Sequence, residues 1–215
     1  MAESKTTISI NNILDFEQRY RATFINSLSG FKSVNLIGSK DRYNNENLAI
    51  FSSVVHIGAT PPLIGLIVRP DSVDRHTLTN ILTTQSYTLN HINDNIFNKA
   101  HQTSARYPKE ESEFEAVGLT PEYKNECFAP FVKESNVQIE MEFKEKIDLK
   151  INGTTLIIGQ IKSIHLPLKA IQEDGFIDLE QLNTITCTGL DSYHKTQRIN
   201  RLSYAKPNQN LKMIK

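Results

Sequence analysis

Residues 137–166 carry the pattern that restricts the fold most, namely two long strands separated by a short turn. From Val137 to Leu149 apolar and polar residues alternate, which is typical of a strand with one buried face. A returning strand is expected from Thr155 to Leu166. Asn152-Gly153 lies between them and favours a type I′ turn, because both residues tolerate positive φ. The sequence therefore predicts a long antiparallel hairpin.

Shorter strands precede this hairpin, and few helices separate them. Strands are expected at 34–37, 48–57, 63–68 and 88–92, with helical spacing at 13–28, 73–82 and 178–183. Many strands with few crossover helices favour a mainly β fold, a closed antiparallel barrel with short helical decorations. Strand and helix alternate over 63–92, so an α/β sheet is the second interpretation.

The 215 residues suit a single domain, with two domains as the weaker alternative. The barrel core is expected at about residues 19–170. Residues 98–136 form a polar excursion from it, and the segment 190–215 is basic, because residues 194–215 hold six lysines and arginines and no acid. Apolar residues recur in the excursion as anchors: Phe114, Val117, Leu119, Phe128 and Phe131.

Composition and missing motifs argue against several classes of function. Lysine plus arginine and aspartate plus glutamate both number 24, and a neutral chain argues against nucleic acid as the main partner. No apolar run approaches the roughly 18 residues that span a bilayer, and residues 1–12 lack the apolar core of a signal peptide. Two cysteines are too few for a disulfide framework, so a cytoplasmic protein is expected. Zinc-binding and phosphate-loop motifs are absent, so no metal site is expected.

Residues 69–81 end a strand, turn and begin a helix, a combination that suits an anion. Free backbone N–H groups at a helix start, here near Asp71 or Ser72, bind phosphate. Arg69 can hold a phosphate with two hydrogen bonds, and Thr77 adds a hydroxyl. Ordinary N-capping by Ser72 with exposed basic residues explains the same pattern. The spacing alone does not separate the two.

A second informative segment, NLAIFSS at 47–53, places two adjacent hydroxyls after apolar strand residues. Adjacent strand residues face opposite ways, so one hydroxyl can point into a pocket. An edge strand with ordinary serines is the alternative.

Ordered pieces between residues 19 and 207 resemble the flavin reductase-like, FMN-binding split-barrel family. In the first half they are NSLSG at 26–30, NLAIFSS at 47–53, PPLIG at 61–65, RP at 69–70, TLTNI at 77–81 and YTLN at 87–90. Later pieces are similar to a flavoredoxin-like branch: TSARYP at 103–108, EF at 113–114, GLTP at 118–121, VKES at 132–135, GLDSY at 189–193 and RLSYAKP at 201–207. The sequence departs from the family at His76, at Met141, where relatives often carry cysteine, and at Lys32-Ser33.

The resemblance implies a six-stranded barrel, a homodimer, and FMN near the subunit interface. It implies that 47–53 lies along the flavin ring and ribityl chain, with Arg69 and Thr77 at the phosphate. The cofactor-binding residues expected from it are Asn47, Leu48, Ala49, Phe51, Ser52, Ser53, Arg69, Thr77, Asn80, Asn90 and Tyr193.

The activity that the resemblance implies is oxidoreduction, in which NADH or NADPH binds transiently and reduces bound FMN. The alternative is an FMN-carrying electron-transfer or flavin-binding module without NAD(P)H activity. No catalytic acid or base is assigned, because in such an enzyme the flavin does the chemistry.

The C-terminal segment carries a further expectation. Tyr193 and Tyr204 flank Lys195, Arg198 and Arg201, and rings with nearby cations suit a flat anionic ligand. We therefore expect this segment to pack near the flavin. A solvated tail is the alternative, since termini are commonly loose.

Overall fold

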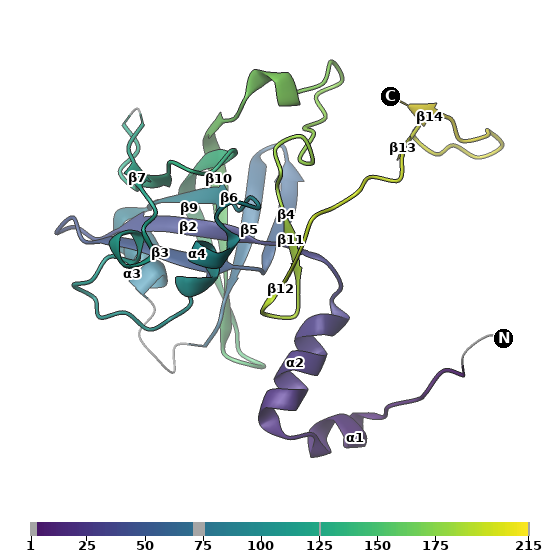
Figure 1. Cartoon of the computed structure of the whole chain (residues 1–215), viewed down its shortest axis with the longest axis horizontal. Helices are drawn as coiled ribbons and strands as arrows, with labels where there is room; N and C mark the ends of the chain where they lie inside the picture. The colour runs from purple at the N-terminus through teal and green to yellow at the C-terminus, as the bar shows by residue number, and fades with distance from the viewer. Residues whose placement is uncertain (1–3, 71–75, 125, 215) are drawn as a thin grey trace.

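The computed structural model describes residues 4–70, 76–124 and 126–214, and one antiparallel sheet forms its centre (Figure 1). Seven strands follow the order β3-β2-β6-β9-β10-β5-β4, and every neighbouring pair is antiparallel. The mainly β prediction is confirmed, and the α/β alternative is wrong because it requires parallel pairs. The strands are β2 Asn35–Lys40, β3 Glu46–Phe51, β4 Val54–Ala59, β5 Pro62–Val68, β6 Ser86–His91, β9 Gln138–Leu149 and β10 Thr154–His165.

The two ends of this sheet are joined by the chain and not by a ladder. β3 and β4 lie at opposite ends of the strand order, yet only Ser52 and Ser53 separate them in sequence. The single strand predicted at 48–57 is therefore two strands, because its first half pairs with β2 and its second half with β5. The prediction of a closed six-stranded barrel is wrong in this detail. Seven strands are described, and β3 and β4 diverge where a ladder would close the sheet.

β9 and β10 form the predicted hairpin, but its turn differs from the prediction. Residues 150–153 connect the strands, and Gly153 has a φ of 71°, while Asn152 is not among the residues with positive φ. The N–H groups of both residues donate to the Leu149 carbonyl, which closes a longer loop than a two-residue turn. Within β10, Gly159 is required by close packing, since a Cβ there would lie 2.0 Å from Tyr87 Oη.

The two largest apolar clusters lie on opposite faces of β2, and Cys127, Ala129 and Phe131 form a smaller third one. Ile37 belongs to the cluster that joins β5, β6, β9 and β10 to α3 (His76–Thr84). Leu36, its neighbour, belongs to the cluster that joins β3 to α4 (Phe97–Gln102), α5 (Glu113–Val117) and β11 (Thr186–Thr188). Successive strand residues face opposite ways, so β2 is buried on both sides.

Residues 98–136 pack on the sheet, as the apolar anchors predict. They contain α4, α5 and the short pair β7 (Pro121–Glu122) and β8 (Phe131–Val132). Phe114, Leu119 and Phe131 are buried, whereas Phe128 remains 38% exposed. The excursion therefore covers its own apolar residues.

Both ends of the chain extend away from the barrel (Figure 1). At the N-terminus, the helical spacing at 13–28 corresponds to two helices, α1 (Ile10–Asp15) and α2 (Gln18–Leu28), with no buried residue in either. At the C-terminus, β13 (Arg201–Leu202) and β14 (Met213–Ile214) form a separate hairpin. A small sheet of β1 (Lys32–Ser33), β11 and β12 (Ser192–His194) lies between these arms and the barrel. The helix predicted at 178–183 is a series of turns, and the nearby helix is a 3₁₀ turn at Leu168–Ala170.

Candidate functional site

A cleft of about 980 Å³ opens where β3 passes into β4. Its lining residues fall within 47–53, 67–69, 76–78, 101–109 and 187–193, together with Val34 and Glu113. The sheet supplies one wall through the β3–β4 junction and the end of β5, and α3 enters through its first turn. The opposite wall comes from the loop after α4 and from the β11–β12 pair.

The structure brings eight of the eleven predicted cofactor-binding residues to the wall of this cleft. They are Asn47, Ala49, Phe51, Ser52, Ser53, Arg69, Thr77 and Tyr193. Leu48, Asn80 and Asn90 do not line it. Leu48 points the other way along β3 and is fully buried in the second apolar cluster. Asn90 is buried at the β6–β8 contact, where its side chain donates to the Leu36 carbonyl and accepts from the Val132 N–H.

Asn80 belongs to a buried amide and hydroxyl network behind the cleft wall. Its Nδ2 donates to Ser39 Oγ at 3.2 Å, and Asn47 Nδ2 reaches the same oxygen at 3.4 Å. Asn47 Nδ2 also donates to Thr77 Oγ1 at 2.9 Å. Because the Thr77 oxygen accepts this bond, its O–H remains available as a donor. The network fixes β2, β3 and α3 relative to one another.

Ser52 and Ser53 give the cleft an unpaired stretch of backbone. They lie between the two ladders, and the described pairing assigns neither a strand partner, although the Ser53 carbonyl accepts from the Ile67 N–H. The thiol of Cys187 also lines the cleft. Burial raises the pKa of that thiol and outweighs the nearby Ser52 side chain, which acts to lower it, so Cys187 is held as a neutral thiol.

Three fixed cations, Arg69, Arg106 and Lys109, line the cleft against two carboxylates, Asp191 and Glu113. Glu113 is buried and accepts a hydrogen bond from the Leu48 N–H at 2.9 Å. Burial raises the pKa of its carboxyl, and this outweighs the opposite effects of that hydrogen bond and of His76. The cleft therefore favours an anionic ligand.

Tyr193 closes one side of the cleft with its ring. Its hydroxyl is hydrogen-bonded to His101 Nδ1 at 2.8 Å, and its ring lies 5.6 Å from that of Phe97. Burial raises the pKa of Tyr193 to about 12, so the phenol keeps its proton near neutral pH. Register with Cys187 across β11 and β12 sets the position of Tyr193.

The rest of the basic tail does not reach the cleft, so the expectation for it is corrected. Lys195 pairs with Asp94, Arg198 with Asp178, and Arg201 with Asp174, all outside the cleft. Tyr204 is 87% exposed. Carboxylates on the body neutralise these cations where they leave the barrel, and only residues up to Tyr193 remain beside the site.

The helix start expected to bind an anion is described from His76 onward. Asp71 and Ser72, the positions expected to begin and cap it, lie outside the described residues. Arg69 and Thr77, on either side of that stretch, both line the cleft. The two residues assigned to the anion site therefore face the same cavity. The capping alternative depends on Ser72, so it also lies outside the described residues.

Several cleft residues were not among the predicted site residues, although motif pieces contained some of them. TSARYP at 103–108 and GLDSY at 189–193 matched the family, yet only Tyr193 was assigned to the site. Glu113 also belongs to a matched piece, EF at 113–114, whereas His101, Lys109 and Cys187 lie outside these pieces and had no local signal. Over the described ranges, no group of three or more potential ligand side chains is arranged to hold a metal ion. No helix in the described part of the chain is long and apolar enough to cross a membrane.

Comparison with known proteins decides the family, because the model of the flavin reductase like domain matches residues 31–179. The chain belongs to the flavin reductase-like family. A protein of Shewanella frigidimarina, described as a candidate flavin reductase with a split-barrel domain, is 52% identical, with a TM-score of 0.91 over 94% of this chain and 100% of that one. Nitrilotriacetate monooxygenase component B from Bacillus cereus shares the fold at 23% identity, with a TM-score of 0.81 over 94% and 100% of the two chains. Flavoredoxin of Desulfovibrio vulgaris (Miyazaki F) also shares it, at 20% identity and a TM-score of 0.69 over 83% and 92%.

Membership of this family makes the chain a flavin-related oxidoreductase, and the cleft has the chemistry that a flavin requires. A flavin presents a flat, largely apolar ring with polar edges. The ring needs an apolar wall with backbone donors, which Ala49, Phe51 and the unpaired stretch at Ser52-Ser53 can supply. A phosphorylated side chain needs cations and hydroxyls, which Arg69 and Thr77 can supply. The residues present therefore fit the cofactor class.

Proposed function

We propose that the chain binds FMN and uses NADH or NADPH to reduce it. The observation that carries this proposal is the juxtaposition of an anion-binding end, built by Arg69, Thr77 and Asn47, with the ring-sized wall at the β3–β4 junction. An unphosphorylated flavin would give Arg69, the cation of the anion-binding end, no phosphate to bind. FMN matches both parts of the cleft.

In this proposal the chain binds and orients the flavin, and the flavin supplies hydride and electron transfer when bound. Thr77 donates its hydroxyl proton and Arg69 its guanidinium N–H groups to the phosphate. Ser52 and Ser53 offer N–H groups and hydroxyls to the polar ring edge. Tyr193, held by His101, borders the ring position and limits water there. Two of the predicted residues, Asn80 and Asn90, act at a distance by fixing the scaffold.

The volume of the cleft supports transient binding of a nicotinamide beside the flavin. Its volume of about 980 Å³ is at the upper end of the range of about 300–1,000 Å³ for small-molecule sites. The flat nicotinamide ring can therefore enter beside a bound flavin, and close stacking of the two rings is the geometry that hydride transfer needs.

Anaerobic mixing with a reduced nicotinamide tests the reaction. We expect NADH or NADPH to bleach the absorption of FMN-loaded protein, and a sample of free FMN at equal concentration to bleach far more slowly. FMN that binds but is not bleached by either nicotinamide would favour the alternative, an FMN-carrying electron-transfer or flavin-binding module. Failure of the chain to bind FMN would contradict both.

We also propose a homodimer, and the arms support it. Large apolar side chains on the arms face water in the single chain: Ile10, Leu14, Tyr20, Leu28 and Phe31 at one end, and Ile199, Leu202 and Met213 at the other. Exposed apolar surface of this extent is typical of an interface. The apolar anchors of the excursion at 98–136 do not contribute to this argument, because the excursion buries most of them internally. Light scattering at micromolar concentration is expected to give twice the chain mass, and a monomer would contradict the proposal.

We propose that the whole chain works as a single domain in the cytoplasm, with flavin and nicotinamide as its small-molecule partners and without nucleic acid or a membrane. The two cysteines support a reducing location, because both are free thiols in the interior.

A further inference from the structure

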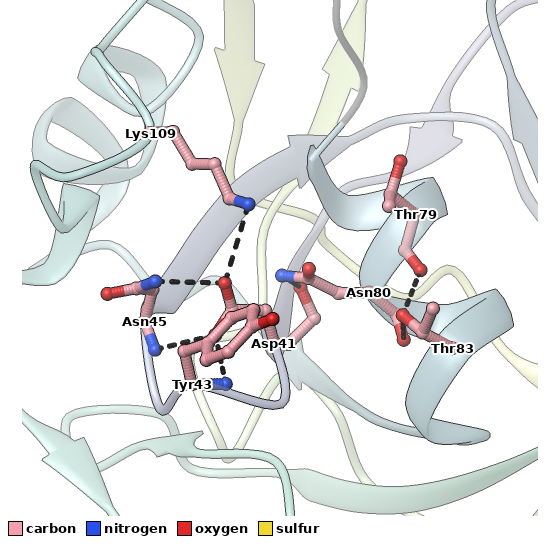
Figure 2. Close-up of polar contacts among 8 residues, drawn as sticks. Asp41, Tyr43, Asn45, Thr79, Asn80, Thr83 and Lys109 are labelled. Carbon is pink, nitrogen blue, oxygen red and sulfur yellow. Dashed lines mark hydrogen bonds and ion pairs between the residues drawn. The ribbon is translucent and has the colours of Figure 1, made fainter.

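A carboxylate in the turn between β2 and β3 is held more firmly than a turn requires. Asp41 Oδ1 accepts the N–H groups of Tyr43 at 2.8 Å and Asn45 at 2.9 Å, and its Oδ2 accepts Asn45 Nδ2 at 2.9 Å (Figure 2). Burial by itself would raise the pKa of Asp41, but these hydrogen bonds and the charge of Lys109 outweigh it and lower the pKa. Asp41 is therefore a fixed anion.

Lys109 points at this anion from the loop after α4 (Figure 2). Its Nζ lies 3.6 Å from Asp41 Oδ2, and its side chain is 54% exposed against 10% for Asp41. Asp41 already accepts three N–H donors, so it does not need Lys109 for its hydrogen bonding. An ion pair with one exposed partner contributes little to stability, about 0–1 kcal/mol. The ammonium is thus held near Asp41 only weakly and remains available to a second anion.

Lys109 borders the anion-binding end of the cleft, while its Nζ is directed at Asp41, which does not line the cleft. Lys109 lines the cleft together with Asn47, His76 and Thr77. It also lines a small hollow beside the cleft, whose wall again includes Asn47 and His76 and carries the carboxylates of Asp41, Glu46, Glu111 and Glu113. Asn47 in turn donates to Thr77 at 2.9 Å. Three elements, the loop after α4, β3 and α3, therefore bring an ammonium, an amide and a hydroxyl to one end of the cavity.

We propose that Lys109 is a ligand of the phosphate monoester of the flavin and that Asp41 is the residue that positions it. This inference rests on the proposed binding of FMN. An ammonium carries three donors, so Lys109 can keep Asp41 and still donate to phosphate oxygens. Its positive charge is opposite in sign to that of a phosphate dianion. The ion pair with Asp41 already restricts the side chain, which reduces the conformational entropy that phosphate binding would otherwise cost.

Flavin affinities of matched variants test the assignment without any catalytic assay. Dissociation constants for FMN and for riboflavin are measured by quenching of flavin fluorescence, at low and at physiological salt. Lys109→Met is expected to weaken FMN by about tenfold, as for loss of one charge-assisted hydrogen bond, while riboflavin affinity is unchanged. Lys109→Arg keeps the charge and is expected to restore most of the preference for FMN. Raised salt should shrink the effect of Lys109→Met.

Two further variants control for structure and for position. Lys146→Met breaks a comparable exposed ion pair, with Asp148 at 2.9 Å on the β9–β10 hairpin, and is expected to leave both affinities unchanged. Asp41→Asn keeps an oxygen that can accept the N–H groups of Tyr43 and Asn45 but loses the charge that orients Lys109. It is expected to lower the ratio of FMN to riboflavin affinity in the same direction as Lys109→Met, and by less.

The outcomes separate this inference from the proposed function. If the wild type prefers FMN and Arg69→Ala reduces the preference while Lys109→Met does not, the assignment of Lys109 is wrong and FMN binding stands. An unchanged or increased preference in Asp41→Asn would remove the positioning role of Asp41. A wild type that binds FMN and riboflavin equally contradicts the phosphate site as a whole.

Discussion

Replacing Arg69 by alanine is expected to weaken FMN binding by about 1.5–3 kcal/mol, or roughly 10- to 150-fold, and to leave riboflavin binding nearly unchanged. Arg69 lines the cleft at the end of β5, next to the first turn of α3. Its guanidinium can form two parallel hydrogen bonds with a phosphate, which riboflavin lacks. Isothermal titration or fluorescence quenching with the two flavins measures the difference directly.

Arg198→Ala is the matched control for this experiment. Arg198 pairs with Asp178 at 2.7 Å outside the cleft, so its removal should alter neither flavin affinity. If Arg69→Ala binds FMN as tightly as the wild type, the phosphate lies elsewhere in the cleft. If wild-type affinities for FMN and riboflavin are equal, the cleft contains no phosphate site.

Deleting residues 190–215 is expected to weaken flavin binding by at least about tenfold, whereas deleting 196–215 should not. The longer deletion removes Leu190, Asp191 and Tyr193 from the cleft wall and leaves β11 without β12. Burying one large side chain contributes about 1.5–3 kcal/mol, which corresponds to the expected loss in affinity. The shorter deletion removes Arg198 and the β13–β14 hairpin, none of which lines the cleft, and keeps the pair between Lys195 and Asp94.

Circular dichroism shows whether each truncated chain keeps its sheet, and light scattering shows whether it keeps its oligomeric state. A folded 190–215 deletion with full flavin affinity would contradict a role for Tyr193 at the site. Weakened affinity in the 196–215 deletion, with no change of oligomeric state, would indicate that the basic tail contributes to flavin binding.

Local patterns in the sequence determined the strands and the anion-binding end of the cleft. Alternation over 137–149 predicts a strand, because the side-chain period of a strand is two residues, although the burial of β9 does not alternate along its length. Arg69 and Thr77 are eight positions apart across a strand end and a helix start, which predicts that they lie close together, and both line the cleft. Ordered motif pieces over 47–53 and 69–81 identified the family, and the family model matches that region.

Tertiary structure decided everything that depends on distant segments meeting. The division of 48–57 into β3 and β4 follows from two different partners, β2 and β5, and no feature of the segment itself records which half pairs where. Lys109 and Asp41 are brought together only by the fold, as are Tyr193 and His101. The basic tail shows the opposite case: Lys195, Arg198 and Arg201 resemble a ligand site in sequence, but carboxylates from remote loops neutralise them. Charge and ring type are properties of a residue, whereas the partner that satisfies them is set by packing across the whole chain.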